Sequence, residues 1–220
     1  MKLVGFGCSF TYGSELVDPS IGEDHHANTR YRNNNVWLGR LARNLGFQFD
    51  NLAQPANSNF AIAQQVSNYF LETYNPQDEI IVCVAWTEKM RMSWYTKDVW
   101  THNGFAGNEH GWPQSAREWL IKSDNKSYDM YTDNSKFIVN NICKAMGITI
   151  IQFNALGHHN ATNYPNYYID GNSMDGLIRR AMSEDDRLKL LASNMHPNEA
   201  GHEYFTIRLT DFVKSHIIKQ

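Results

Sequence analysis

The sequence predicts a three-layer α/β/α domain built on a parallel sheet, because short apolar runs alternate with helical patterns. Two of the runs are near-continuous and rich in β-branched residues, which is typical of parallel strands buried on both faces. The predicted strands are Lys2–Gly7, Phe47–Ala53, Glu79–Ala85 and Ile148–Asn154.

Helical patterns separate these strands and follow the last one. Val36–Leu45 places its apolar residues close to one face and precedes Gly46, a typical residue just beyond a helix end. Right-handed strand–helix–strand units would place the helices on both faces of the sheet. The predicted helices are Val36–Leu45, Asn59–Tyr74, Asp133–Met146, Met174–Met182 and Pro197–Ile218.

The length of 220 residues suits a single domain spanning 1–220, with insertions near 14–35, 88–132 and 156–193. Long loops in compact domains usually serve as lids or binding segments. Aromatic residues fit a sugar-stacking platform, a satellite hydrophobic cluster or an oligomer contact about equally well. They are Trp94, Trp100, Trp112 and Trp119 in the second insertion and the tyrosines of Tyr164–Tyr168 in the third.

Charge and composition exclude several classes of function. The net charge is −3 and the sequence has no long basic run. The charge pattern therefore supports neither nucleic-acid binding nor polybasic membrane attachment. No window reaches transmembrane length and the apolar start is too short for a signal peptide, which predicts a cytoplasmic or virion-associated protein. Cys8, Cys83 and Cys143 match no zinc spacing, and we expect the last two to be core thiols.

The sequence contains nine histidines, but their spacing does not predict a metal site. His25-His26 and His158-His159 are adjacent pairs, and successive side chains rarely face one ion. We therefore expect no metal and no cofactor. His202 is expected to be a helix residue that packs beneath the site.

Two segments carry residue types that nucleophilic catalysis needs. Ser9 directly follows the first strand inside the glycine-rich segment Gly5–Gly13, and a serine hydroxyl needs an adjacent base to become a nucleophile. His196 stands before Pro197, a favoured residue at the start of a helix. Each alone also fits a turn serine or a capping histidine. In parallel sheets, however, function sits at the carboxyl ends of the strands, where Ser9 lies.

Together these segments resemble the SGNH (GDSL-type) hydrolases. Gly7–Gly13 reads Gly-Cys-Ser-Phe-Thr-Tyr-Gly where the family has Gly-Asp-Ser-x-Thr-x-Gly, and His196-Pro197 is followed by Gly201-His202 as in the family's last block. Asn51–Asn59 resembles the family's Asn-x-Ala-x-x-Gly block. The resemblance implies a flavodoxin-like parallel sheet, the SGNH hydrolase fold.

The resemblance also implies roles for single residues. Ser9 would attack an acyl carbonyl, and His196 would take its proton and return it to the leaving group. The oxyanion hole would use the backbone N–H groups of Ser9 and of the second block's glycine position, which is Ala56 here, together with an asparagine amide.

That asparagine is missing after the third strand, where the chain reads Ala85–Arg91. We expect Thr87 to line the site and Asn57 or Asn59 to supply the amide. Arg91 would hold a substrate carboxylate, or pair with nearby acids. A Trp-Thr start with a downstream arginine resembles divergent family members, many of them encoded by bacteriophages.

The family's aspartate, two or three residues before His-Pro, is also missing. Ser193 and Asn194 occupy these positions, and we expect one of them to orient His196 through an oxygen atom. The sequence therefore predicts a Ser–His dyad or an incomplete triad.

These residues predict a serine esterase or deacylase acting on O-acyl esters, of a carbohydrate or another small ester. The alternative is a weak or inactive glycan-binding or structural protein of the same fold, in a viral particle for example. A nucleotide-binding domain fits less well, since Gly5-x-Gly7 lacks the third spaced glycine of a dinucleotide site. The expected partner is a small ester or acylated glycan, with no nucleic acid and no membrane, and with a homo-oligomer through the Trp-rich insertion.

Overall fold

The structure is a computed structural model that describes residues 1–22, 26–96, 99–103, 125–157, 164–168, 173–180 and 189–218. Trp112, Trp119 and the pair His158-His159 lie outside the described residues. The roles predicted for the Trp-rich insertion therefore stay predictions.

A parallel sheet of four strands forms the centre of the molecule, in the order β2-β1-β3-β6. The near-continuous apolar runs of the sequence form strands that are buried on both faces, and every residue of β3 is buried. This arrangement confirms the predicted fold class. The strands are β1 (Lys2–Phe6), β2 (Gln48–Asn51), β3 (Ile80–Trp86) and β6 (Thr149–Asn154).

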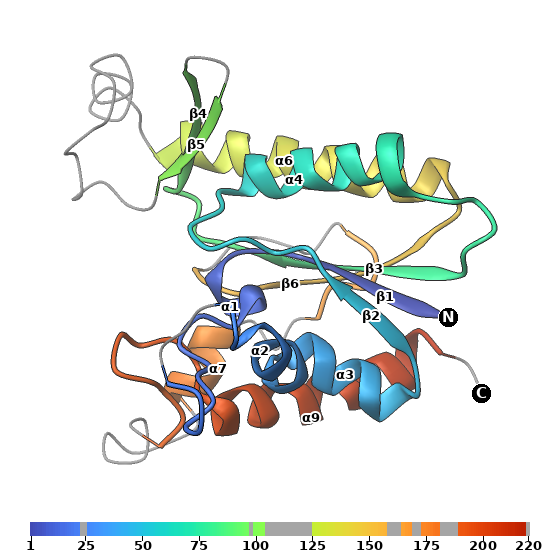
Figure 1. Cartoon of the computed structure of the whole chain (residues 1–220). Coiled ribbons are helices and arrows are strands. Elements are labelled where there is room, and N and C mark those ends of the chain that lie inside the picture. Colours follow the sequence, from blue (N-terminus) through green and yellow to red (C-terminus); the bar gives the residue numbers. More distant parts are fainter. Residues whose placement is uncertain are drawn as a thin grey trace.

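Helices cover both faces of this sheet (Figure 1). One face carries α4 (Asn59–Asn68) and α6 (Asn125–Ala145). Each face buries its own hydrophobic cluster, centred on Val82 and Ile62 on this side and on Trp37 and Phe205 on the other. The opposite face carries α2 (Thr29–Asn35), α3 (Trp37–Leu45), α7 (Met174–Arg180) and α9 (Glu199–His216).

Aromatic and polar contacts hold the helical segments that differ from the predicted ones. α6 begins at Asn125 rather than Asp133, and its first turns pack through Tyr131, whose ring stacks on Phe60 of α4 at 5.5 Å. α2 lies in the insertion that was expected to be irregular, and its buried Arg32 donates a hydrogen bond to the Tyr12 hydroxyl. Neither segment has the apolar periodicity that predicts a helix.

Two further local elements depart from the simple skeleton. α4 continues into the π-helical turn η1 (Tyr69–Thr73), so that the predicted helix Asn59–Tyr74 divides in two. In the second insertion, β4 (Met92–Thr96) pairs antiparallel with β5 (Val99–Asn103).

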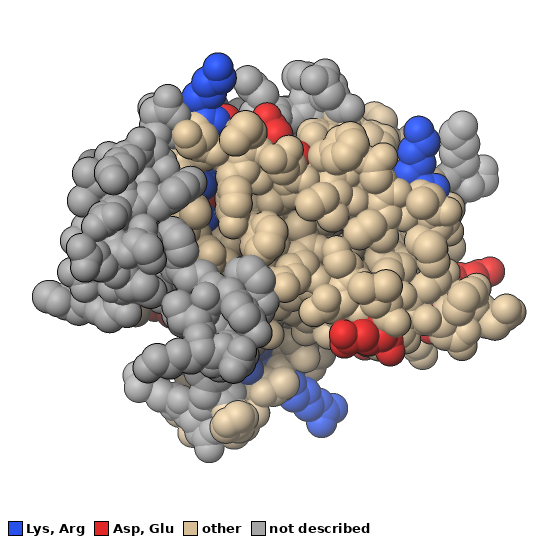
Figure 2. Space-filling model, turned by 90° about the horizontal axis from the view of Figure 1, so that it is seen from above, with Lys and Arg blue, Asp and Glu red and all other residues tan. Residues whose placement is uncertain are grey.

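The outer surface over α4 and α6 shows few lysine, arginine, aspartate or glutamate side chains (Figure 2). Large apolar side chains stay exposed on this layer, among them Leu71, Met130 and Phe137. No helix among the described residues is long and apolar enough to cross a membrane.

The carboxyl end of β1 lies at the point where the strand order of the sheet reverses. β1 pairs with β2 on one side and β3 on the other, and the connections to these two neighbours run over opposite faces of the sheet. Ligands of open α/β sheets bind at such a switch point, outside the carboxyl ends of the strands. The short helix α1 (Ser9–Tyr12) begins at this point.

Candidate active site

Ser9 sits on a tight turn between β1 and α1. A Cβ atom at Gly7 would lie 2.4 Å from Thr11 Oγ1, so only glycine lets the chain turn this closely. The Ser9 side chain is nearly buried, and its hydroxyl makes no hydrogen bond to any described residue. Because Ser9 is the first residue of α1, its backbone N–H has no acceptor within the helix.

His196 is held by a compact loop that leads into α9. Ala192 N donates to His196 O at 2.8 Å, and Asn198 N donates to Leu190 O at 3.0 Å. The loop lies against the first turn of α9, because a Cβ atom at Gly201 would be 2.2 Å from Leu190 O. A larger residue at Gly201 would therefore push the loop, and His196 with it, away from the helix.

The turn that carries Ser9 and the loop that carries His196 meet through Phe10. The Phe10 ring lies 5.5 Å from the His196 ring, centroid to centroid, and Phe10 is the residue next to Ser9. The structure therefore brings the two predicted catalytic residues to the same end of the sheet. No hydrogen bond joins Ser9 Oγ to His196 within the described part of the chain, and catalytic hydrogen bonds in unliganded enzymes are often long.

The His196 ring has a carboxylate partner that the sequence analysis missed. Glu15 Oε2 lies 2.8 Å from His196 Nδ1. Ser193 and Asn194, which were expected to orient the ring, instead donate hydrogen bonds to Glu15 Oε1. No local pattern marks Glu15, since it lies in a polar insertion among other acids and far from His196 along the chain.

Hydrogen bonds keep the Glu15 carboxyl ionised. Burial by itself raises the pKa of this group. Bonds from the Asn194 backbone, the His196 ring, the Ser193 hydroxyl and the His196 backbone outweigh burial, so that the pKa lies below its usual value. At neutral pH the ring of His196 therefore faces a negative charge.

The second block contributes Ala56, whose backbone is left-handed with φ of 61°. This is the conformation that glycine adopts most readily, and the family block has glycine at this position. Leu52 N donates to Gly5 O at 2.9 Å and Gln54 N donates to Gly7 O at 3.2 Å, so the block runs beside the turn that carries Ser9. The backbone geometry of a glycine is thus kept despite the substitution.

The amides of Asn57 and Asn59 are engaged within the protein. Asn57 Nδ2 donates to Gly7 O and to Gln65 Oε1, at 3.0 and 2.9 Å. Asn59 accepts from Thr87 N at 2.8 Å and donates to Thr87 O at 3.1 Å, and Thr87 is fully buried. A contact from either amide to substrate would require one of these bonds to exchange, so their predicted role stays a prediction.

A pocket of about 610 Å³ opens beside His196. It contains basic and acidic side chains, and Arg179 holds Asp175 through two contacts, at 2.8 and 2.9 Å. Thr87 does not line this pocket. The residues that bear on binding are Phe10, Glu88, Arg91, Arg179, Arg180 and His196.

The described histidines and acids form no cluster of three or more that would hold a metal ion. The three cysteines are buried and free, and burial raises the pKa of Cys143 to about 12. Cys83 and Cys143 are core thiols, as the sequence predicted.

The fold of this chain, a parallel four-stranded sheet flanked by helices, is shared with solved structures of esterases. No family model and no curated protein match the sequence. Solved structures do match, and the three described next are similar at 9–13% identity, so the likeness shows a shared fold.

The psychrotrophic esterase EstA of Pseudoalteromonas sp. is 9% identical with a TM-score of 0.53, over 97% of each chain. The acetylxylan esterase Axe2 of Geobacillus stearothermophilus, in a catalytic mutant form, is 11% identical with a TM-score of 0.52, over 100% of this chain and 96% of that one. The acetyl xylan esterase Est2A of Butyrivibrio proteoclasticus is 13% identical with a TM-score of 0.55, over 97% of this chain and 63% of that one.

Proposed function

We propose that this protein is a serine ester hydrolase of the SGNH (GDSL-type) family, with Ser9 as nucleophile and His196 as general base. The observation that carries the proposal is the contact between Phe10 and His196, which unites the first and last sequence blocks at the switch point of the sheet. The fold shared with three esterases supports the same class of reaction.

The chemistry follows from which ring nitrogen is available. His196 Nδ1 faces Glu15, so Nε2 is the nitrogen left to take the proton of Ser9. Ser9 Oγ forms a bond to the acyl carbon, the ester C–O bond breaks, and His196 returns the proton to the departing alcohol. Water, deprotonated by His196, then attacks the acyl-enzyme and releases the acid together with free Ser9.

Two backbone N–H groups are suited to the negative charge that develops on the carbonyl oxygen. Ser9 opens α1 and its N–H has no helical acceptor, while Ala56 holds the glycine-like conformation of the second block. A donor of this kind is typically worth about 10²–10³ in rate. Asn57 or Asn59 would add an amide donor after one internal hydrogen bond exchanges.

The proposed substrate is an O-acyl ester of a carbohydrate. Two of the three esterases that share the fold are acetyl xylan esterases, and a pocket of about 610 Å³ beside His196 has room for a sugar unit. Arg91 lines this pocket and would bind a carboxylate on the substrate. Thr87 donates a hydrogen bond from its backbone N–H to Asn59, and its predicted place in the lining of the site stays a prediction.

A fluorophosphonate probe and an acetylated xylo-oligosaccharide test the proposal together. We expect the probe to label Ser9, and we expect Ser9→Ala to abolish labelling and reduce kcat by about 10⁶-fold. Ser14→Ala is the matched control, because Ser14 is a half-buried serine in the same segment. Equal ester turnover in wild type and Ser9→Ala would refute the proposal.

Two observations favour the second candidate, a non-catalytic glycan-binding or structural protein of the same fold. Ser9 Oγ and His196 are not hydrogen-bonded in the described part of the structure, and the block after β3 has no asparagine. Glycan binding that survives His196→Ala, with no hydrolysis in the wild type, would select this candidate.

A further inference from the structure

We propose that Glu15 is the positioning acid of this site and takes the place of the aspartate that SGNH hydrolases carry shortly before the histidine. This inference rests on the proposed function and extends it to a residue outside every family block. It changes the predicted dyad into a triad of Ser9, His196 and Glu15, whose acid comes from the segment directly after α1, the short helix that begins at Ser9.

The first step of the argument is the contact with the ring. Glu15 Oε2 lies 2.8 Å from His196 Nδ1, which is the nitrogen that the acid of a serine-hydrolase triad contacts. An ionised carboxylate only accepts hydrogen bonds, so this contact places the ring proton on Nδ1. Nε2 then carries a lone pair, as a base must.

The second step is the direction of the remaining hydrogen bonds. Glu15 Oε1 accepts from Ser193 Oγ at 3.0 Å, from Asn194 N at 2.9 Å and from Asn194 Nδ2 at 3.0 Å. Glu15 Oε2 also accepts from His196 N at 3.3 Å. These donors all lie in the segment where the family has its aspartate. The segment that has lost a carboxylate thus binds one from another part of the chain.

The third step is the backbone that presents Glu15. Gly13 ends α1 with φ of 83°, Leu16 is buried in the core, and Glu15 between them is left-handed with φ of 67°. A left-handed residue other than glycine costs about 1–3 kcal/mol and persists only where its surroundings impose it. Such strain gathers at functional sites, and Met195, beside His196, is left-handed too with φ of 69°.

The competing explanation is that Glu15 only anchors the loop. An anchor acts through the stability and position of the loop, whereas a positioning acid also fixes the ring tautomer and stabilises the charged imidazole formed in the transition state. Glu15→Gln separates the two, because the amide keeps the size of the side chain but loses its charge. Glu199→Gln is the matched control, since Glu199 is a half-buried glutamate of α9 that accepts from the Tyr31 hydroxyl at 2.8 Å.

The first measurement is the steady-state kinetics of each variant, with kcat normalised to the fraction of Ser9 that a fluorophosphonate titrates. We expect Glu15→Gln to lower kcat by about 10²–10⁴-fold while KM changes by less than about threefold, and Glu199→Gln to match the wild type. A normalised kcat for Glu15→Gln within about threefold of wild type would overturn the inference.

The second measurement returns a carboxylate to the family's position. In the double variant Glu15→Gln/Ser193→Asp, we expect kcat to recover at least about tenfold relative to Glu15→Gln alone. Equal or lower normalised kcat in the double variant, with unchanged thermal unfolding, would count against a role as acid.

A third measurement does not depend on esterase activity. In ¹⁵N-histidine NMR, with the His196 signal assigned through His196→Ala, we expect the proton on Nδ1 in wild type and a shift toward Nε2 in Glu15→Gln. An unchanged tautomer would contradict the inference even if the protein hydrolyses esters. Equal turnover in wild type and Ser9→Ala would instead refute the esterase, whatever the tautomer shows.

Discussion

Two histidines on either side of the start of α9 have opposite environments. His196 lies in the loop before the helix, with its side chain 24% exposed and a carboxylate at Nδ1. His202 lies in the first turns of the helix and is completely buried. Both belong to the same sequence block, so the difference between them shows that burial and partners, rather than residue type, decide which histidine can act as a base.

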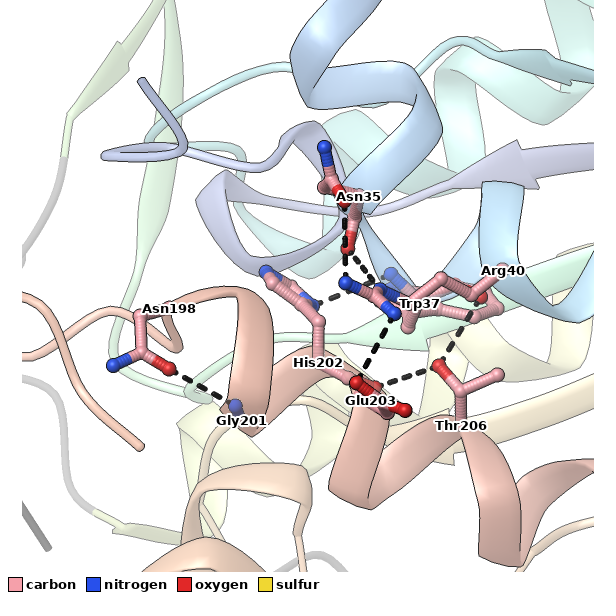
Figure 3. A network of polar contacts seen from close by, with 8 residues as sticks. All are labelled: Asn35, Trp37, Arg40, Asn198, Gly201, His202, Glu203 and Thr206. Carbon is pink, nitrogen blue, oxygen red and sulfur yellow. Dashed lines mark hydrogen bonds and ion pairs between the residues drawn. The ribbon is translucent and has the colours of Figure 1, made fainter. Parts of the chain in front are cut away.

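His202 is held as a neutral structural residue (Figure 3). Its Nδ1 accepts a hydrogen bond from Trp37 N at 3.3 Å, and its Nε2 is buried and has no hydrogen-bond partner among the residues that the structure describes. Burial, with minor contributions from Arg40 and His196, lowers the pKa of His202 to about 3. A ring in this state joins α9 to the start of α3 and cannot exchange protons with substrate, which agrees with its predicted place beneath the site.

The largest expected effect separates the two histidines by activity. We expect His196→Ala to lower kcat by about 10⁴–10⁶-fold, because Ser9 loses its base, while its free energy of unfolding stays within about 1 kcal/mol of wild type. Kinetics with an acetylated oligosaccharide and urea unfolding at pH 7.5 measure both quantities. A His196→Ala variant with wild-type kcat would remove the contrast altogether.

The next effect separates them by the pH dependence of stability. The unfolded chain protonates His202 near pH 6.5, but the folded chain does so only near pH 3, so folding loses stability as the pH falls through this window. Between pH 7.5 and pH 5.0 we expect this group to cost about 2 kcal/mol of the free energy of unfolding. Urea unfolding at the two pH values measures the loss.

The variant His202→Asn should be less stable than wild type at pH 7.5 but should lose about 2 kcal/mol less on going to pH 5.0. His216→Asn is the matched control, since His216 is an exposed histidine of the same helix and should keep the wild-type pH dependence. The same pH dependence in wild type and His202→Asn would show that His202 is not the buried neutral group described above.

The smallest expected effect concerns the residue that separates the two environments. Asn198 caps α9 by accepting from Gly201 N at 3.0 Å (Figure 3). Its Nδ2 donates to Lys189 O at 2.9 Å. We expect Asn198→Ala to cost about 1 kcal/mol of the free energy of unfolding, as lost N-caps do, and to lower kcat only a few-fold. Asn141→Ala, an exposed asparagine within α6, is the control and should leave both quantities unchanged. A kcat loss as large as that of His196→Ala would mean that the cap, too, sets the position of the base.

The pattern of apolar residues was sufficient to predict the sheet and most helices. β3 and β6 are continuous apolar runs, and a run of this kind has few stable places other than the middle of a parallel sheet. α2 and the first turns of α6 were missed because they are held by polar and aromatic contacts, such as those of Arg32 and Tyr131, that leave no apolar period.

Local patterns likewise predict some residues of the candidate site and not others. Ser9 and His196 could be predicted as site residues from the sequence because each lies beside a residue with a local structural role. Glycine allows the tight turn before Ser9, and Pro197 favours a helix start after His196. Glu15 could not be identified, since its role depends on the meeting of two loops that are 178 residues or more apart along the chain.

The sequence by itself determined the layered parallel fold, the end of the sheet where Ser9 lies and the histidine before the last helix, because hydrophobic periodicity and turn residues act locally. Only the tertiary structure decided which groups touch His196, that the buried His202 stays neutral and how Ala56 keeps a glycine's backbone. Those outcomes depend on burial, on hydrogen-bond geometry and on charge between distant segments, which no local pattern encodes.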